Sequence, residues 1–282
     1  MLSKLQKSNS IEPGVYDIDI DEYHLGKGYS RSALLEFQKS PFHFWYSLNN
    51  KEERQPVDII KKINAFEFGN ALHTYVLERE TFPDRYVVMP KVKRNTKAGK
   101  QEFEEIRDRS GTRQIICEEA FAEIELMAQS IDLHEEAGQL IGGALYEKSI
   151  YWNDPGTDLL CKVRPDIWHS NFIGDLKTCV SGSYKDFQRS IVSYGYHIQA
   201  GMIQEAIKHV LGEKIKSFVY IAIEKDPPYA VAVYQLDEMA VEEGVAQFRH
   251  IIKGVKECLD SGDWPGYPTE IMALPTWAFA AI

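Results

Sequence analysis

The stretch Lys162-Val163-Arg164-Pro165-Asp166, followed after eight intervening residues by Asp175-Leu176-Lys177, carries the clearest structural signal in this 282-residue chain. The residues around it are rich in β-branched and aromatic types, with His169-Ser170 as a turn, which predicts two strands of a hairpin. Side chains two apart on a strand lie on the same face, so Asp175 and Lys177 project together while Leu176 faces the core. The hairpin brings Asp166 beside them.

Two carboxylates that converge in this way repel each other unless a divalent cation compensates their charge. Hard oxygen ligands favour Mg²⁺ or Mn²⁺ over zinc. An ammonium beside such an ion can orient or help deprotonate water and stabilise charge that develops on a phosphate. Asp175-Leu176-Lys177 is the one acid-x-Lys triplet in the chain. The pattern indicates phosphodiester hydrolysis, and a structural salt bridge on a sheet surface remains the alternative on spacing alone.

The rest of the chain predicts an α/β fold in which a mixed central β-sheet is flanked by helices. Apolar residues at helical spacing begin after Ser30 and continue in later segments. We expect helices over residues 64–80, 114–130, 194–211 and from about 237 to 258. We expect a three-stranded meander over residues 146–152, 159–167 and 171–178, and a hairpin over 216–224 and 229–236.

Residues 1–25 are expected to form an irregular N-terminal arm, because they contain Pro13, Gly14 and a run of acids from Asp17 to Glu22. Residues 26–282 then form a single domain, since no internal repeat or linker interrupts them.

Four ordered motifs resemble a known family. Arg164-Pro165-Asp166 and Gly174-Asp175-Leu176-Lys177-Thr178 resemble the restriction-endonuclease-like core of the PD-(D/E)xK nuclease superfamily. Phe68-Gly69-Asn70-Ala71-Leu72-His73 resembles the Gly-x-x-x-His helix of its RecB-like branch. Tyr196-His197-Ile198-Gln199-Ala200 resembles the helix that follows the catalytic strand. With the segment from Ser30 to Pro41, their order and spacing are most similar to RecE-type exonucleases (exonuclease VIII), over about residues 22–275.

The resemblance implies a role for each matching residue. Asp166 and Asp175 would bind the metal, with the main-chain carbonyl of Leu176 as a further ligand, and Lys177 would activate or orient water. His73 would complete the metal site, with Gly69 allowing its helix to approach closely; without the family, a histidine at the edge of an apolar arc is usually a boundary residue.

Three further groups of residues are candidates for the site or for DNA binding. Glu147 aligns with an acidic residue that precedes the core in related nucleases and would bind metal or water, while an exposed strand residue is the alternative. Tyr196 and Gln199 would contact the DNA backbone or brace Lys177, although Ile203 replaces a tyrosine common in the family. A basic stretch is either a solvated loop or a contact to DNA phosphates: Lys91, Lys93, Arg94, Lys97 and Lys100.

The function implied is an Mg²⁺-dependent deoxyribonuclease, with Mn²⁺ able to substitute, that degrades double-stranded DNA ends processively in the 5′ to 3′ direction during phage-type recombination. The family implies a homo-oligomeric ring, a tetramer or trimer, and a single-strand annealing protein as partner. Two alternatives stay open: a catalytically idle module that binds DNA ends or a recombination partner, and a single-strand or repair nuclease of the same fold.

Composition agrees with a globular protein, with 44% hydrophobic and 26% charged residues. No apolar run approaches the roughly 20 residues that span a bilayer, and Met1 to Ser10 lacks the apolar core of a signal peptide, so we expect a cytoplasmic protein without membrane contact. The net charge of −10 argues against coating of nucleic acid by overall charge but allows a local basic channel. The four cysteines lack metal-ligand spacing and are expected to be reduced thiols.

Overall fold

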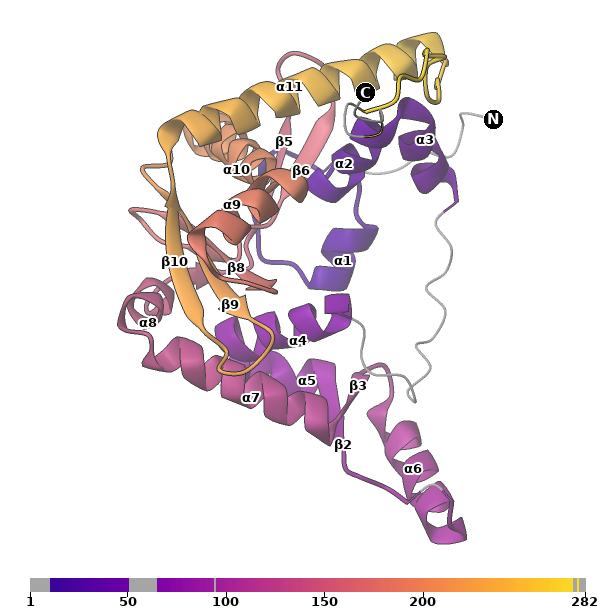
Figure 1. The fold of residues 1–282 in the computed structure, drawn as a ribbon, viewed down its shortest axis with the longest axis vertical. Helices are drawn as coiled ribbons and strands as arrows, with labels where there is room; N and C mark the ends of the chain where they lie inside the picture. Colours follow the sequence, from indigo (N-terminus) through magenta and orange to yellow (C-terminus); the bar gives the residue numbers. More distant parts are fainter. Residues whose placement is uncertain (1–10, 51–64, 94, 276–277, 279–282) are drawn as a thin grey trace.

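A five-stranded mixed sheet runs through the centre of the molecule in the order β10-β9-β8-β7-β4 (Figure 1). The computed structural model describes residues 11–50, 65–93, 95–275 and 278. β8 and β9 are parallel, and the other neighbours in this sheet are antiparallel. The strands are β4 (Leu145–Tyr146), β7 (Ile167–Trp168), β8 (Ile173–Cys179), β9 (Phe218–Glu224) and β10 (Val231–Leu236). The expected α/β class with a mixed central sheet is confirmed.

Helices cover both faces of this sheet, because its central strands are apolar on both sides. In β9, Phe218 and Tyr220 face one core, while Ile221 and Ile223 face the other. The first core contains α2 (Arg31–Lys39), α3 (Pro41–Asn49), α9 (Tyr184–Ser193), α10 (Tyr196–Leu211) and α11 (Glu238–Ser261). The second contains α4 (Ala65–Leu77), α7 (Glu118–Leu133) and α8 (Glu135–Ile141).

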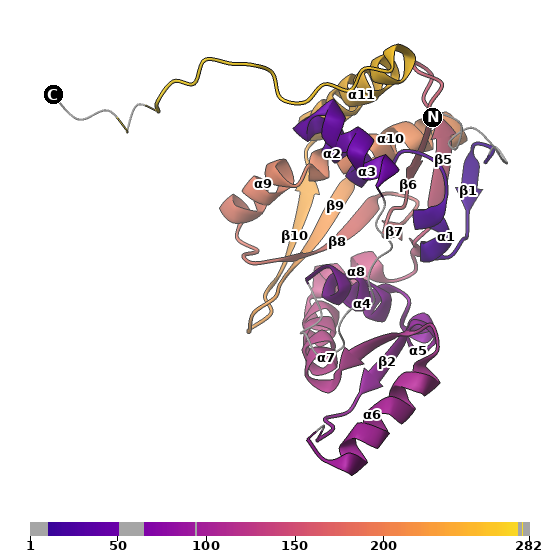
Figure 2. The same ribbon diagram turned by 90° about the vertical axis from the view of Figure 1, so that its right-hand side faces the viewer.

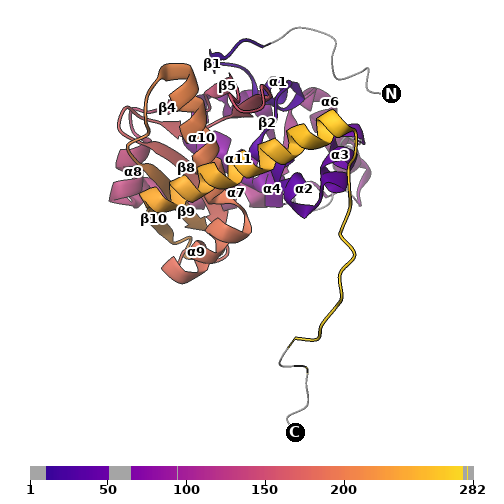
Figure 3. The same ribbon diagram turned by 90° about the horizontal axis from the view of Figure 1, so that it is seen from above.

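The outermost helix, α11, crosses over α10 (Figure 3). Their contact is closest at Gly244, where an added Cβ would lie 1.9 Å from the His197 carbonyl oxygen. A side chain is therefore excluded at this crossing. After α11 the chain first packs against α3, where the Trp264 and Phe44 ring centroids are 5.8 Å apart, and then leads away from the body (Figure 2).

A separate three-stranded sheet has the order β1-β5-β6, with β1 (Gly14–Tyr16), β5 (Ser149–Asn153) and β6 (Leu160–Val163). The expected three-stranded meander is therefore wrong as one sheet, because β5 pairs with β6 on one side and with β1 on the other, and neither β5 nor β6 pairs with β8. Arg164-Pro165-Asp166 separates β6 from β7. Proline lacks the N–H that would continue a ladder, so the chain leaves one sheet there and enters the other.

The N-terminal segment is regular, and the expectation of an irregular arm is wrong for its described part. β1 pairs with β5, and α1 (Ile20–Leu25) follows with Asp19 as its N-cap. Two buried cations of the β6 segment hold it in place. Lys162 Nζ donates to the carbonyls of Tyr23 and Gly26, both at 2.6 Å, and Arg164 Nη1 donates to the Ile18 carbonyl at 2.9 Å. That residues 26–282 form a single nuclease domain stays a prediction.

The region between α4 and α7 also differs from expectation. After η1 (Arg79–Thr81) and α5 (Phe82–Arg85), β2 (Tyr86–Met89) pairs in parallel with β3 (Gln114–Cys117). Between them α6 (Lys97–Ser110) begins at a Thr96 cap. Residues 114–117 are thus a strand rather than the start of a helix. Among the described helices, none has the length and apolar character needed to cross a membrane.

Candidate active site

The candidate site lies at the edge of β8 where its partner β7 ends. β7 pairs only Ile167 and Trp168 with Gly174 and Ile173, so no described strand covers this side of β8 beyond Gly174. Asp166, immediately before β7, takes the place of a strand: its Oδ2 accepts a hydrogen bond from the Leu176 N–H at 2.8 Å. The turn at His169-Ser170 brings Asp166 to β8 as the sequence predicts.

Asp175 and Lys177 share a face of β8 and form an ion pair between Asp175 Oδ2 and Lys177 Nζ. Asp175 is fully buried, and its Oδ1 accepts a hydrogen bond from Gln199 Nε2 at 2.6 Å. The Tyr196 ring centroid lies 5.0 Å from Lys177 Nζ. Tyr196 of α10 therefore contacts Lys177, as one of its two predicted roles requires, whereas Gln199 holds Asp175 rather than Lys177. Direct DNA contact by these two residues stays a prediction.

His73 extends from α4 to the other side of Asp166, with Nδ1 3.4 Å from Asp166 Oδ2. Burial and the charge of Lys177 lower the pKa of His73 to about 4. At neutral pH the ring is uncharged, so one nitrogen keeps a lone pair for a metal. The close-packing role expected for Gly69 is wrong, because no described atom lies within 4 Å of a Cβ built there.

Glu147 lies between β4 and β5 in the left-handed backbone region, with φ of 52°. Its N–H donates to the Asp166 carbonyl at 3.2 Å, and its Oε2 accepts from Arg164 Nε at 2.7 Å. Burial raises the pKa of Glu147 against the lowering effect of Arg164. The alternative of an exposed strand residue is therefore wrong.

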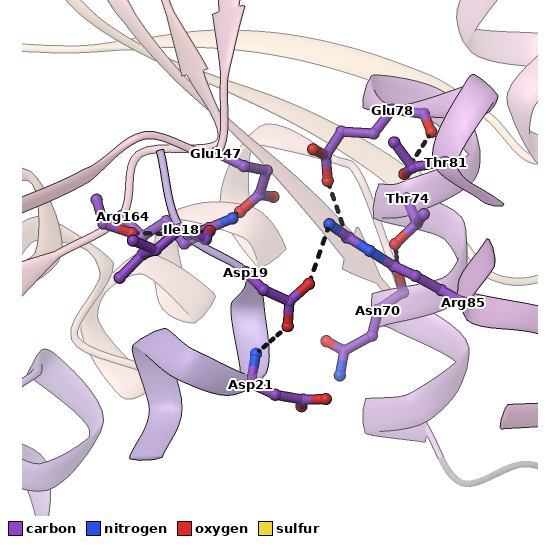
Figure 4. Close-up of polar contacts among 11 residues, drawn as sticks. Ile18, Asp19, Asp21, Asn70, Thr74, Glu78, Thr81, Arg85, Glu147 and Arg164 are labelled. Carbon is purple, nitrogen blue, oxygen red and sulfur yellow. Dashed lines mark hydrogen bonds and ion pairs between the residues drawn. The ribbon is translucent and has the colours of Figure 1, made fainter. Parts of the chain in front are cut away.

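Figure 4 shows the polar surroundings of Glu147. Arg164 bonds Glu147 on one side and the Ile18 carbonyl on the other, which links the site to the N-terminal segment. Nearby, Arg85 pairs with Glu78 of the α4–η1 connection at 2.9 Å and with Asp19 at 3.8 Å. Charged groups from three distant parts of the sequence thus meet at this end of the site.

The donor set fits a divalent cation that prefers oxygen. His73, Glu147 and Asp166 each offer one ligand atom, and these three atoms lie within 4.8 Å of one another. Burial, and after it the charge of Asp175, raise the pKa of Asp166 well above its ordinary value, although Lys177 acts to lower it. The carboxylates suit Mg²⁺ or Mn²⁺, whereas an imidazole is a ligand more typical of transition metals. The charge of Asp175 acts on Asp166, but Asp175 does not belong to the cluster of His73, Glu147 and Asp166.

The basic stretch lies away from this site. Lys91 and Lys93 are exposed in the β2–α6 connection, and Lys97 and Lys100 are exposed in the first turns of α6. In two views α6 lies beyond α4 and α7 on the side away from β8 (Figures 1 and 2). Lys91 Nζ is 3.3 Å from Glu119 Oε1, and Arg94 lies outside the described residues. Contact of these residues with DNA stays a prediction.

Sequence reasoning missed the roles of two arginines. The Arg164-Pro165-Asp166 motif gives no sign that its arginine holds Glu147. Arg31 donates to the Tyr194 carbonyl at 2.8 Å and lies 5.7 Å from the Tyr196 ring. A signal for Arg31 was present: it begins a helix whose first turn has no acid, although cations are unfavourable at helix N-termini.

Residues 30–274 match the sequence model of a family described as a PDDEXK-like domain of unknown function (DUF3799). The chain belongs to this family. The resemblance to the PD-(D/E)xK superfamily is thereby confirmed, whereas a particular closeness to RecE-type exonucleases is an untested prediction. A search of curated proteins finds no match.

Solved structures share the fold of this DUF3799 chain. A crystal structure from Eubacterium rectale, described as a "Putative exonuclease", aligns with 90% of the chain and 97% of its own length, with a TM-score of 0.58 and 16% identity. At this identity the likeness concerns the fold. SSO0001 aligns with 65% of the chain and 86% of its own length at a TM-score of 0.26 and 14% identity, too low to carry an argument.

Proposed function

We propose that this chain is a metal-dependent deoxyribonuclease that hydrolyses phosphodiester bonds beside β8. The observation that carries the proposal is the convergence of Asp166, Asp175 and Lys177 at the edge of β8: Asp166 bonds the Leu176 N–H, and Lys177 pairs with Asp175. Buried carboxylates next to a partly buried ammonium match the needs of phosphoryl chemistry, in which negative charge increases in the transition state. Membership of a PDDEXK-like family supports this proposal.

Asp166, Asp175, His73 and the Leu176 carbonyl would hold Mg²⁺, or Mn²⁺ in its place, with Glu147 as a further ligand or a partner of bound water. The ion would supply Lewis-acid activation of water and compensation of phosphate charge. The neutral His73 offers a lone pair, because burial holds its pKa at about 4. The hydrogen bond from Leu176 N–H fixes Asp166 Oδ2, the oxygen that also lies 3.4 Å from His73 Nδ1.

The catalytic work of the chain itself falls to Lys177. Its Nζ, which forms the ion pair with Asp175, would orient the attacking water or stabilise charge on the phosphate. Gln199 keeps Asp175 in place through its hydrogen bond to Oδ1. The Tyr196 ring keeps the lysine close by a cation–π contact.

The finer proposal is a processive exonuclease that acts on double-stranded DNA ends in the 5′ to 3′ direction within a recombination system. Its support is the resemblance of four ordered motifs to RecE-type exonucleases and a structural relative described as an exonuclease. A homo-oligomeric ring would reconcile the net charge of −10 with a basic inner surface, and an annealing protein would receive the single-stranded product.

One assay tests this proposal most directly. A linear duplex labelled at one 5′ end or one 3′ end is incubated with Mg²⁺, with Mn²⁺ or with EDTA, and the products are resolved over time. We expect cleavage only with the metals and early release of the 5′ label. A closed circular duplex should survive. Failure of the wild-type protein to cut linear, single-stranded or nicked DNA with either metal would contradict nuclease function.

The two alternatives separate in the same assay. A catalytically idle end-binding module would retain DNA without cutting it, but the intact set of Asp166, Asp175 and Lys177 argues against it. A single-strand or repair nuclease would cut unpaired or nicked substrates in preference to blunt duplex ends.

A further inference from the structure

An exposed tyrosine stands at the outer end of a row of stacked groups that leads to Lys177. The Tyr194 and Tyr196 ring centroids are 5.6 Å apart with an interplanar angle of 30°. The Tyr196 ring in turn lies 5.0 Å from Lys177 Nζ. Tyr194 is 59% exposed, so much of its ring is open to solvent within a short distance of the catalytic lysine.

The main chain fixes the position of Tyr194. Arg31 Nη1 donates to the Tyr194 carbonyl at 2.8 Å, and the Tyr194 N–H donates to the Ser190 carbonyl at 2.9 Å. Gly195 follows with φ of 62°, and a Cβ there would lie 3.0 Å from Leu35. This turn between α9 and α10 holds the two tyrosines ring against ring. A ligand that stacks on Tyr194 therefore meets a surface that is already ordered.

A cleft of about 540 Å³ adjoins this ring, and its lining includes Arg31, Lys39, Tyr194 and Tyr196. Lys39 pairs with Glu36 at 2.7 Å, whereas no carboxylate pairs with Arg31 in the part of the chain that the structure describes. Aromatic faces beside cations bind single-stranded nucleic acid, because bases stack on the rings and phosphates are attracted to the charges.

We propose that Tyr194 and this cleft bind one unpaired nucleotide, with its base stacked on the Tyr194 ring, next to the phosphodiester that is cleaved at Lys177. The inference rests on the proposed nuclease function and specifies how the substrate strand is held. A base inside a duplex already has neighbours on both faces, so the base stacked on Tyr194 must come from a strand end or from unpaired nucleic acid. The protein would then bind DNA with unpaired ends more tightly than closed circular duplex DNA.

Binding without cleavage provides the first test. A short fluorescein-labelled single strand and a matched strand with abasic sites are titrated in EDTA, with anisotropy as the readout. We expect the wild type to bind the base-bearing strand on the order of 10-fold more tightly than the abasic strand. Tyr194→Ala should lose this preference while binding the abasic strand as the wild type does. Tyr194→Phe should keep it.

Two further variants make the binding test specific. Tyr184→Ala is the matched control. Tyr184, the first residue of α9, is likewise an exposed tyrosine, with 69% of its surface accessible, but its ring centroid lies 6.1 Å from that of Tyr234. This variant should keep the preference for bases. Tyr194→Leu retains apolar bulk without an aromatic face and should lose it, with thermal melting as the check that the variant folds. Retention of the full preference by Tyr194→Ala or Tyr194→Leu would overturn the proposal.

Cleavage kinetics separate this inference from the nuclease proposal. In Mg²⁺, Tyr194→Ala should raise KM on the order of 10-fold and change kcat by less than about twofold, because stacking contributes to binding rather than to chemistry. Cleavage with an unchanged KM would refute the stacking site alone. Base-dependent binding through Tyr194 in a protein that cuts no DNA would refute the nuclease and support the stacking site.

Discussion

Gln199 Nε2 donates to Asp175 Oδ1 at 2.6 Å and so joins α10 to the buried acid of β8. The Oε1 atom of Gln199 has no hydrogen-bond partner among the described groups, so the bond to Asp175 is the contact through which this amide can act on the site. A hydrogen bond to a charged group contributes about 1.5–3 kcal/mol. We therefore expect Gln199→Leu to lower kcat on linear DNA by roughly 10-fold to 100-fold.

The control for this prediction lies on the same helix. Gln204→Leu alters a glutamine of α10 that lines a different cleft, and it should leave kcat unchanged. Gln199→Glu should be at least as damaging as Gln199→Leu, because it places a second carboxylate against Asp175. Wild-type kcat in Gln199→Leu would remove the positioning role.

Lys177→Ala tests the proposed catalytic group. Loss of one preorganised electrostatic stabiliser costs on the order of 10²-fold in rate, about 3 kcal/mol. We expect single-turnover cleavage of linear duplex to slow by this factor or more, while the melting temperature stays close to that of the wild type. Lys185→Ala, an exposed lysine of α9, should cleave normally. Equal rates for the two variants would contradict the assignment.

Asp166→Asn should raise the stability of the metal-free protein. Burial and Asp175 raise the pKa of Asp166, so the folded chain binds a proton that the unfolded chain releases. Stability from this group therefore falls as pH rises from the ordinary carboxyl value towards the raised one, and stays reduced above it. At pH 8 His73 is neutral in both states, since its folded pKa is about 4.

Thermal melting at pH 8 measures this effect. In EDTA, Asp166→Asn should melt higher than the wild type by roughly 2–4 °C for each kcal/mol of relieved repulsion. Added Mg²⁺ should stabilise the wild type and have little effect on the variant. A lower melting temperature for Asp166→Asn in EDTA would show that the carboxylate is not destabilising.

Lys162→Met should loosen the N-terminal segment. The ammonium is buried and bonds the carbonyls of Tyr23 and Gly26, and an unpaired buried carbonyl costs about 1–3 kcal/mol. We expect a loss of about 2 kcal/mol in unfolding free energy and faster proteolysis within residues 11–26. Lys214→Met is the control, because Lys214 is exposed and pairs with Glu238, outside the N-terminal segment. Equal protease resistance of the two variants would contradict an anchoring role.

Neutralising the basic stretch should weaken the salt dependence of DNA binding. Lys93, Lys97 and Lys100 are exposed, whereas Lys91 already pairs with Glu119. If the three lysines contact phosphates of duplex DNA, their replacement by glutamine makes the negative slope of log K against log salt less steep, by about 0.9 for each contact. An unchanged slope would remove α6 from the DNA interface. The control replaces three paired surface lysines: Lys214, Lys253 and Lys256.

The sequence predicted the parts of the site that depend on local pattern. Alternation along a strand placed Asp175 and Lys177 on one face, and the turn at His169-Ser170 brought Asp166 to Leu176. Helical spacing identified α4 and therefore His73. The hairpin of β9 and β10 followed from apolar alternation around its central prolines. Each of these features is set by residues close together in the chain.

The errors arose where distant segments pair. β1 is only three residues long, and it is a strand because it pairs with β5, more than 130 residues later. The acids near it suggested an exposed arm, since nothing local indicates that Lys162 and Arg164 would bond its carbonyls. Likewise β2 and β3 define each other across α6. Such pairings contribute no periodic signal to either segment.

The parallel pairing of β8 with β9 also bears on when the proposed site can form during synthesis. β8 cannot complete its parallel partnership until residues 218–224 have left the ribosome, and Asp175 lacks its amide support until α10 has formed. A chain stalled during translation before that point carries its acids and lysine without the scaffold that aligns them. If the chain cleaves DNA as proposed, a partial copy that ends before β9 would lack the aligned acids and lysine, and cleavage would require synthesis through residue 224.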